Sequence, residues 1–214
     1  MRVVALISGS GSNLQALIDA MQCRALPIDI VAVISSRADA FGLRRAEQAG
    51  IATAIVDPAR YATRDTYDIA LKKTIDEHSP QLVVLAGFMR ILTPDFVAHY
   101  ADRMLNVHPS LLPVLRGLHT HRRALETKEA RHGASIHFVT SELDGGPVVL
   151  QASVVVRPDD TPEILAERVQ TREHMILPLA VRWFATGRLY AQGQQAWLDG
   201  KSLNQPLLID CSNV

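Results

Sequence analysis

Two polar side chains that could take part in catalysis lie two residues apart in the segment LNVHPSLLP, residues 105–113. Alternate side chains of a β-strand point to the same face, so Asn106 and His108 would face one site. Pro109 disfavours a helical residue before it, which predicts His108 at the carboxyl end of a strand. The amide and the imidazole could donate hydrogen bonds to a developing oxyanion. The alternative is a buried histidine satisfied by neighbouring carbonyl groups.

A carboxylate in a glycine-rich turn is the third candidate. The segment ELDGGP, residues 142–147, contains Asp144 followed by two glycines, which let a turn approach another backbone closely. Asp144 beside His108 would orient the imidazole and favour its protonated form, although Asp is also a common turn residue. The sequence contains no GxSxG, CxxC, HExxH or Walker A pattern. We therefore expect neither a covalent nucleophile nor a metal.

The segment SGSGSNLQ, residues 8–15, predicts an anion site between a first strand and a first helix. Free N–H groups and the helix dipole favour a phosphate there, and a side chain at Gly11 is expected to block it. The third glycine position of a dinucleotide fingerprint is Leu14, which favours a mononucleotide over NAD or FAD. The alternative is a helix merely capped by Ser12 or Asn13.

Apolar runs alternate with amphipathic segments along the first half of the chain. Near-continuous apolar runs are typical of strands buried on both faces. The pattern predicts an α/β fold, with an open, mostly parallel, twisted sheet, helices on both faces and a Rossmann-like N-terminal half. The predicted strands are 3–7, 28–34, 52–56, 82–86 and 104–107, and the predicted helices are 13–21, 41–50 and 63–80.

The second half is expected to add antiparallel strands to the sheet. Residues 134–140 and 148–156 read as two strands joined by the Asp144 turn, and a long helix should begin at a Thr161 cap. Two polar stretches, 109–132 and the residues after Gly187, are expected to be irregular. The first is predicted to be a lid over the site.

Bulk composition restricts the class of protein. The 214 residues are 48% hydrophobic, which favours one domain, and 22 basic residues balance 22 acidic ones. No basic surface for nucleic acid is therefore expected. The two cysteines, Cys23 and Cys211, are too few for a disulfide framework, and the N-terminal apolar run is too short for a signal or membrane segment. We expect a cytoplasmic protein.

Several segments together resemble the glycinamide ribonucleotide formyltransferase family of purine synthesis. The most specific are NVHPSLLP and LDGGP, and they are accompanied by ISGSGSNLQALIDA, VVLAGFMRIL, GLHTHRRALE and RVQTREHMILPLAVRWFATGRL. The resemblance implies transfer of a formyl group from the cosubstrate 10-formyltetrahydrofolate to the amine of glycinamide ribonucleotide. It implies a formyltransferase fold in a single domain, 1–214, with a mononucleotide-binding half (1–100), a catalytic and folate-binding half (101–190) and a C-terminal tail (191–214).

The resemblance also implies roles for individual residues. Asn106, His108 and Asp144 would be catalytic. The ribonucleotide would be bound by Gly11, Ser12, Asn13, Gln170 and Glu173. The folate would be bound by Arg64, Met89, Arg90, Ile91, Leu92, Thr140, Ser141, Glu142, Leu143 and Asp144. Small-molecule substrates are the expected partners, with no metal, membrane or nucleic acid, and a homodimer is a further expectation.

One segment departs from the family pattern. After SLLP the family usually has an aromatic residue with lysine or proline, whereas this chain has Val114, Leu115 and Arg116.

Three other functions are alternatives for this sequence. A formyltetrahydrofolate deformylase-like hydrolase would share the catalytic residue types, but an additional N-terminal domain would be expected. Methionyl-tRNA formyltransferase would add a basic nucleic-acid domain. A nucleotide-binding module without catalysis would leave NVHP and LDGGP unexplained.

Overall fold

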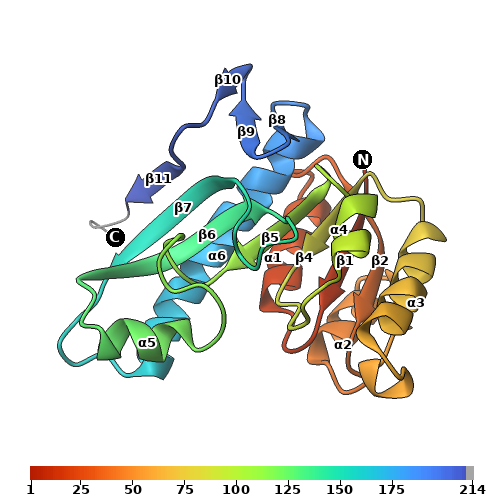
Figure 1. Ribbon diagram of the computed structural model, residues 1–214, viewed down its shortest axis with the longest axis horizontal. Coiled ribbons are helices and arrows are strands. Elements are labelled where there is room, and N and C mark those ends of the chain that lie inside the picture. The colour runs from red at the N-terminus through yellow and green to blue at the C-terminus, as the bar shows by residue number, and fades with distance from the viewer. Residues whose placement is uncertain (211–214) are drawn as a thin grey trace.

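The computed structural model describes residues 1–210, in which eight strands form one sheet and three more form a small second sheet (Figure 1). Cys211 lies outside the described residues. The elements are β1 (Arg2–Ile7), α1 (Ser12–Gln22), β2 (Asp29–Ser35), α2 (Phe41–Gln48), β3 (Ala52–Ile55), the 3-10 helix η1 (Pro58–Arg60), α3 (Arg64–Asp76), β4 (Leu82–Leu85), α4 (Pro94–His99), β5 (Met104–His108), α5 (Thr120–Glu126), β6 (Arg131–Phe138), β7 (Val148–Val155), α6 (Pro162–Ala185), β8 (Leu189–Gln192), β9 (Gln195–Leu198), β10 (Lys201–Ser202) and β11 (Leu207–Asp210).

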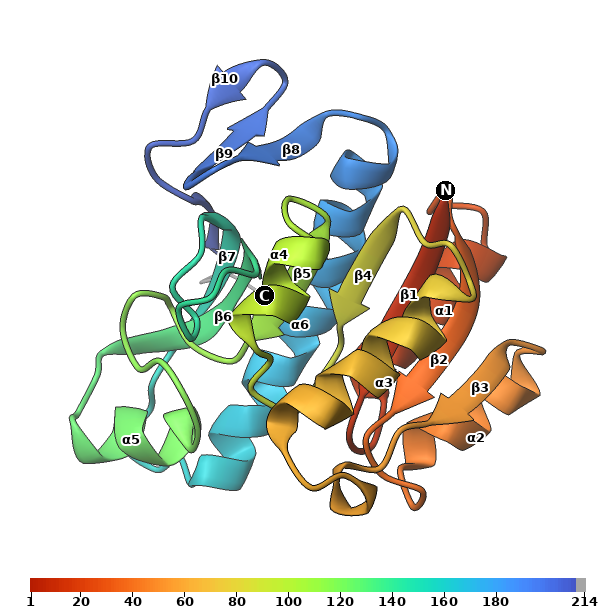
Figure 2. The ribbon, with the colours of Figure 1, turned by 45° about the vertical axis from the view of Figure 1, so that its right-hand side comes forward.

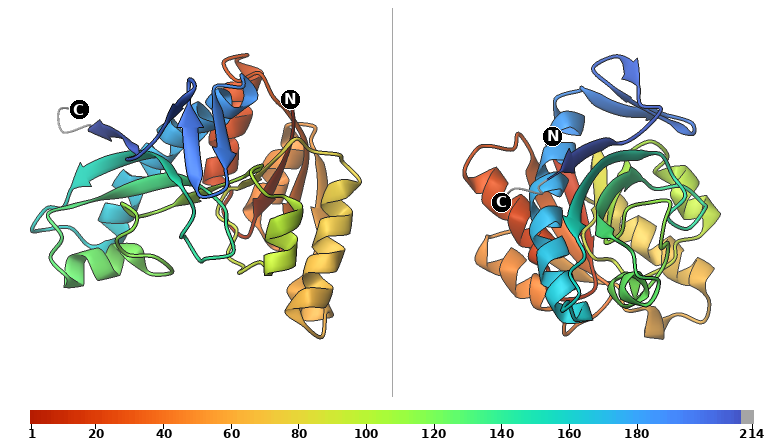
Figure 3. Two further views of the ribbon diagram at one scale, coloured as in Figure 1. Left: turned by 45° about the horizontal axis from the view of Figure 1, so that its top comes forward. Right: turned by 90° about the vertical axis from the view of Figure 1, so that its left-hand side faces the viewer.

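Strand β1 divides the hydrophobic core into two layers. Its side chains alternate, so Val3, Ala5 and Ile7 pack on one face of the sheet with α1, α2 and α6. Val4 and Leu6 pack on the other face with α3 and α4. Figure 3 shows α6 running beside α1 on the first face. The predicted α/β architecture with helices on both faces is confirmed.

The sheet reverses its order between β1 and β4. Its strand order is β11-β7-β6-β5-β4-β1-β2-β3, so the chain builds outward from β1 to β3 and then returns to place β4 on the other side of β1. β1, β2, β4 and β5 are parallel, so their carboxyl ends lie at one edge. The crevice at such a reversal is where open α/β sheets bind ligands. It brings together the loops that follow β1, β4 and β5.

The antiparallel addition predicted for the second half is present. β6 pairs antiparallel with both β5 and β7. The register places Asn106 opposite His137 and His108 opposite Ser135. The long helix α6 begins after Thr161, whose side chain accepts a hydrogen bond from the Ile164 N–H, as the sequence predicted.

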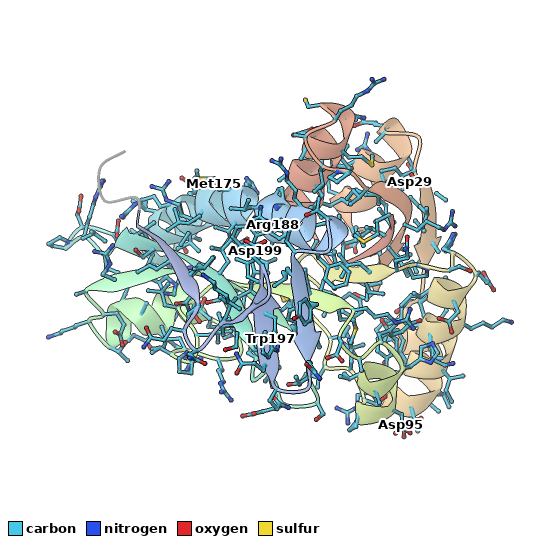
Figure 4. The ribbon with its side chains drawn as sticks, turned by 90° about the horizontal axis from the view of Figure 1, so that it is seen from above. Asp29, Asp95, Met175, Arg188, Trp197 and Asp199 are labelled. Carbon is cyan, nitrogen blue, oxygen red and sulfur yellow. The ribbon has the colours of Figure 1, made fainter. Side chains whose placement is uncertain are left out.

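The two stretches predicted to be irregular contain secondary structure. The first contains α5, whose N-cap residue His119 adopts a left-handed conformation and makes no side-chain capping hydrogen bond, so the usual sequence signal for a helix start is missing. The C-terminal stretch forms β8, β9 and β10 (Figure 2), and β11 then joins the main sheet beside β7 (Figure 1). In β8 and β9 the rings of Tyr190 and Trp197 stack, and Arg188 pairs with Asp199 (Figure 4).

The short helix α4 was also absent from the sequence prediction. It has six residues, with Thr93 as cap and Pro94 at its first position. So short a segment has too little periodicity to show its amphipathic pattern. Among residues 1–210, no helix is both long and apolar enough to span a lipid bilayer.

The structure shows a packing role for Gly11. This residue, and not a Ser12 or Asn13 side chain, forms the N-cap of α1. Its φ is +70°, and a Cβ atom there would lie 2.5 Å from the Cα atom of Gly42 in α2. A side chain at Gly11 would therefore collide with α2, a packing conflict that the sequence did not predict. The glycine lets the first loop pack tightly on α2.

Gly11→Ala should lower the free energy of unfolding by roughly 2–4 kcal/mol, because it adds steric overlap to an unfavourable positive φ. Gly50→Ala is the matched control, since Gly50 also has a positive φ (+72°) but no described atom lies within 4 Å of its Cβ position. That variant should lose only about 1 kcal/mol. Urea unfolding of both variants measures the difference, and equal losses would contradict the packing argument.

Candidate active site

Asn106 and His108 lie at the carboxyl end of β5 and share a face, as the sequence predicted. His108 is 5% exposed. Its Nε2 atom is 3.0 Å from the carbonyl oxygen of Leu115, and its Nδ1 atom is 3.4 Å from Asp144 Oδ2. Both neighbours are acceptors only, so this arrangement suits an imidazole that carries hydrogen on both nitrogens.

The carboxylate of Asp144 is almost fully buried beside His108. Its side chain is 9% exposed, and Oδ2 accepts a hydrogen bond of 2.9 Å from the N–H of Gly117. Asp144 has a φ of +48°, an uncommon conformation for a residue with a side chain. Such conformations persist where the surroundings determine them, and here the turn directs the carboxylate inward. The predicted contact between Asp144 and His108 is present.

Asn106 is oriented by a histidine on the neighbouring strand. Its Nδ2 atom is 3.0 Å from Nε2 of His137, and Nδ1 of His137 lies 2.9 Å from the carbonyl oxygen of Phe138. That carbonyl requires hydrogen on Nδ1, so Nε2 accepts from the amide of Asn106. Burial lowers the pKa of His137 to about 4 and keeps this acceptor unprotonated near neutral pH. The second amide hydrogen of Asn106 stays available for a ligand.

Asn106 and Asp144 line a cavity of about 120 Å³, whereas His108 lies outside the lining and contacts it through Asp144. Both of the loops predicted to bind folate contribute to its lining, together with Asn106 and His137. Arg64, the first residue of α3, and Met89, which is 62% exposed, are the two predicted folate residues outside the lining. The lining residues are Leu85, Phe88, Arg90, Ile91, Leu92, Val97, Asn106, His137, Val139, Thr140, Ser141, Glu142, Leu143 and Asp144.

The segment that departs from the family pattern closes one side of this site. The Leu115 carbonyl contacts His108, and Gly117 contacts Asp144. Arg116 forms an ion pair with Glu142 in the cavity wall. Leu115 has a φ of +58°, so the turn is held in an unfavourable conformation by these contacts.

The first turn of α1 meets α6 at the predicted ribonucleotide site. The Asn13 amide donates a hydrogen bond of 2.6 Å to Oε2 of Glu173, and both side chains are buried. Burial raises the pKa of Glu173, whereas the hydrogen bond from Asn13 acts in the opposite direction. Gln170 is exposed nearly one turn earlier on α6, and Ser12 begins α1. Within the described chain, the Asn13 Oδ1 atom is buried without a hydrogen-bond partner.

Comparison with known proteins places the chain in a family. Residues 1–181 match the family described as Formyl transferase. The chain is 56% identical over 203 residues to the phosphoribosylglycinamide formyltransferase of Escherichia coli strain K12, covering 95% of this chain and 96% of that protein. It is 44% identical to the protein of that name from Haemophilus influenzae, covering 94% and 95%. The chain belongs to the formyl transferase family.

A solved structure supports the same conclusion for the fold of this formyl transferase. The phosphoribosylglycinamide formyltransferase of Coxiella burnetii superimposes with a TM-score of 0.92 at 50% sequence identity. The match covers 97% of this chain and 99% of that chain. The open, mostly parallel sheet is therefore the fold of the family.

Three further residues of this formyl transferase lie beside predicted site residues, and the sequence did not indicate them. His137 stands in an apolar strand, and only the β5–β6 register brings it to Asn106. Arg45 donates hydrogen bonds to the Ser10 carbonyl and to Gln15, which places a guanidinium against the first loop. His174 follows Glu173, and burial and then Arg45 lower its pKa. The Arg44–Arg45 pair resembles an ordinary helix surface, so the sequence carried no signal for it.

Beneath the site, α5 is joined to β6 by a pair of histidines. Nδ1 of His121 is 3.1 Å from Nε2 of His132, and the rings meet edge to face. One nitrogen of this contact must lack hydrogen. Burial, reinforced by His121 and His108, lowers the pKa of His132 to about 4 from its ordinary value of 6.5. The folded state therefore holds His132 in its neutral form.

This depressed pKa predicts a loss of stability in acid. Between pH 6.5 and 4 the unfolded chain binds a proton at His132 that the folded chain does not, so the free energy of unfolding should fall as the pH falls through this window. His132→Gln should give a shallower dependence over the same range. Urea unfolding at half-unit pH intervals measures both slopes, and identical slopes would show that His132 does not contribute.

Proposed function

We propose that this protein is a phosphoribosylglycinamide formyltransferase. It transfers the formyl group of 10-formyltetrahydrofolate to the amine of glycinamide ribonucleotide, and it yields formylglycinamide ribonucleotide and tetrahydrofolate in de novo purine synthesis. The observation that carries this proposal is the contact of His108 with Asp144, together with the position of Asn106 and Asp144 in the lining of the cavity. The chain also spans nearly the whole length of relatives with that name.

The transfer proceeds directly from one substrate to the other. The amine nitrogen attacks the formyl carbon, the carbonyl oxygen becomes an oxyanion, and the bond from that carbon to the folate nitrogen then breaks. The proton lost by the amine passes to the folate nitrogen through a bound water. Asn106 donates its free amide hydrogen to the oxyanion. His108 donates from Nε2, so the formyl oxygen takes over the place of the Leu115 carbonyl.

The buried carboxylate of Asp144 supports the charge on His108. A cation buried beside a carboxylate is stabilised, and its hydrogen bond to the growing negative charge then strengthens. The arrangement needs no covalent nucleophile, because a primary amine attacks a formyl amide directly. The surroundings of the two histidines give them different roles. His137 is kept neutral and orients Asn106, whereas His108 faces a carboxylate.

The two substrates would occupy different parts of the crevice. The phosphate of the ribonucleotide would be bound at Gly11, Ser12 and Asn13 at the start of α1, with the rest of that substrate near Gln170 and Glu173. Arg45 and His174 would add positive charge and a hydrogen-bond donor. The folate ring would lie in the cavity between residues 89–92 and 140–144, and Arg64 and Arg90 would meet its carboxylates. We also propose the division into residues 1–100, 101–190 and 191–214.

Incubation with 10-formyltetrahydrofolate, with and without glycinamide ribonucleotide, tests this function. Tetrahydrofolate and formylglycinamide ribonucleotide should form only when both substrates are present, as measured by mass spectrometry. Release of formate without the ribonucleotide, at a rate equal to that with it, would instead indicate the formyltetrahydrofolate hydrolase. The sequence similarity favours the transferase.

Asp144→Asn should reduce kcat by roughly 10²-fold or more, with the KM for the ribonucleotide nearly unchanged. The reason is that the carboxylate acts mainly while negative charge develops on the formyl oxygen. Asp199→Asn is the control: Asp199 also has a positive φ and pairs with a cation, but it lies in the turn between β9 and β10. Steady-state kinetics of both variants measure the effect. A wild-type rate in Asp144→Asn would make Asp144 a turn residue only.

A further inference from the structure

A buried hydroxyl joins the two loops that would hold the two substrates. Ser8 follows β1 immediately and is 7% exposed. Its Oγ atom accepts a hydrogen bond of 2.9 Å from the N–H of Met89, in the loop after β4. Its own N–H donates to the carbonyl of Gly87, at 3.1 Å. Ser8 thus contacts the loop after β4 through both its backbone and its side chain.

A second serine, Ser36, holds the hydroxyl group of Ser8 in place. The Oγ atoms of Ser8 and Ser36 are 2.7 Å apart, and Ser36 is 3% exposed at the end of β2. A hydroxyl that accepts from Met89 can still donate its hydrogen to Ser36. The three contacts connect the ends of β1, β2 and β4 at the point where the strand order reverses.

The position of this link matters because the two reacting atoms are carried by different substrates. Ser8 begins the loop that leads to residues 11–13, which would take the ribonucleotide phosphate. Met89 begins residues 89–92, which would form a wall of the folate site. Transfer requires the amine nitrogen and the formyl carbon to approach within about 3–3.5 Å, and a small displacement of either substrate slows it strongly. The relative position of the two loops therefore decides the rate.

We propose that Ser8 is a positioning residue that fixes the loop after β1 relative to the loop after β4. Its hydroxyl thereby sets the distance between the amine nitrogen and the formyl carbon. This inference rests on the proposed function. Ser8 contacts neither reacting atom and acts through Met89. Its loss should therefore reduce kcat while each substrate still binds its own loop.

Ser8→Ala should lower kcat about tenfold, with the KM of each substrate within about threefold of wild type. Ser35→Ala is the matched control, because Ser35 is the buried last residue of β2, next to Ser36. Among residues 1–210 its hydroxyl bonds only to Arg37, within its own turn. It should keep the wild-type kcat. Ser36→Ala leaves the Ser8 hydroxyl free to rotate, so its kcat should lie between those of wild type and Ser8→Ala. This variant tests the proposal if Ser8→Ala does not fold.

Calorimetry provides a readout without catalysis. Glycinamide ribonucleotide is titrated into the protein with and without tetrahydrofolate, and the ratio of the two dissociation constants measures the coupling between the sites. The ratio should differ from one in wild type and in Ser35→Ala, and it should approach one in Ser8→Ala. A wild-type kcat or an unchanged ratio in Ser8→Ala would overturn the inference. Failure of the wild-type protein to bind either ligand would instead overturn the proposed function.

Discussion

The structure depends on the burial of β1 between two layers of helices. Alternate side chains of this strand enter opposite cores, so it must lie inside the sheet with neighbours on both sides. β2 and β4 occupy those two positions. Because all three strands are parallel, their carboxyl ends meet at one edge, and the loops that follow them converge. The ligand crevice is thus a consequence of how the core is filled.

Several unfavourable features of the chain concentrate at this edge. Asp144 and Leu115 have positive φ values without being glycine, and the carboxylates of Asp144 and Glu173 are buried. Each feature costs stability unless specific partners compensate for it. The partners are present, in the form of His108 and Gly117 for Asp144 and of Asn13 for Glu173. The large apolar core supplies the stability that such a preorganised site requires.

Environment gives chemically identical residues different tasks in this site. His137 is buried and donates to a backbone carbonyl, so its remaining nitrogen serves as an acceptor that orients an amide. His108, on the adjacent strand, lies between a carbonyl and a carboxylate and is therefore a donor. The two roles depend on the β5–β6 register, because a shift of one residue would turn His137 to the opposite face.

The parallel strands, their helices and the position of His108 at a strand end followed from the sequence, because apolar periodicity and Pro109 are local signals. The family resemblance added the catalytic assignment. The sequence could not predict α5, whose start lacks a capping side chain, or the small C-terminal sheet, which depends on contacts such as that between Tyr190 and Trp197.

Only the tertiary structure decided which residues meet across long sequence separations. It showed that Gly11 packs against Gly42, that His137 faces Asn106 and that Asn13 reaches Glu173. These contacts depend on strand order, register and the placement of α6. No periodicity encodes them, because they arise from packing among elements that are distant in the chain.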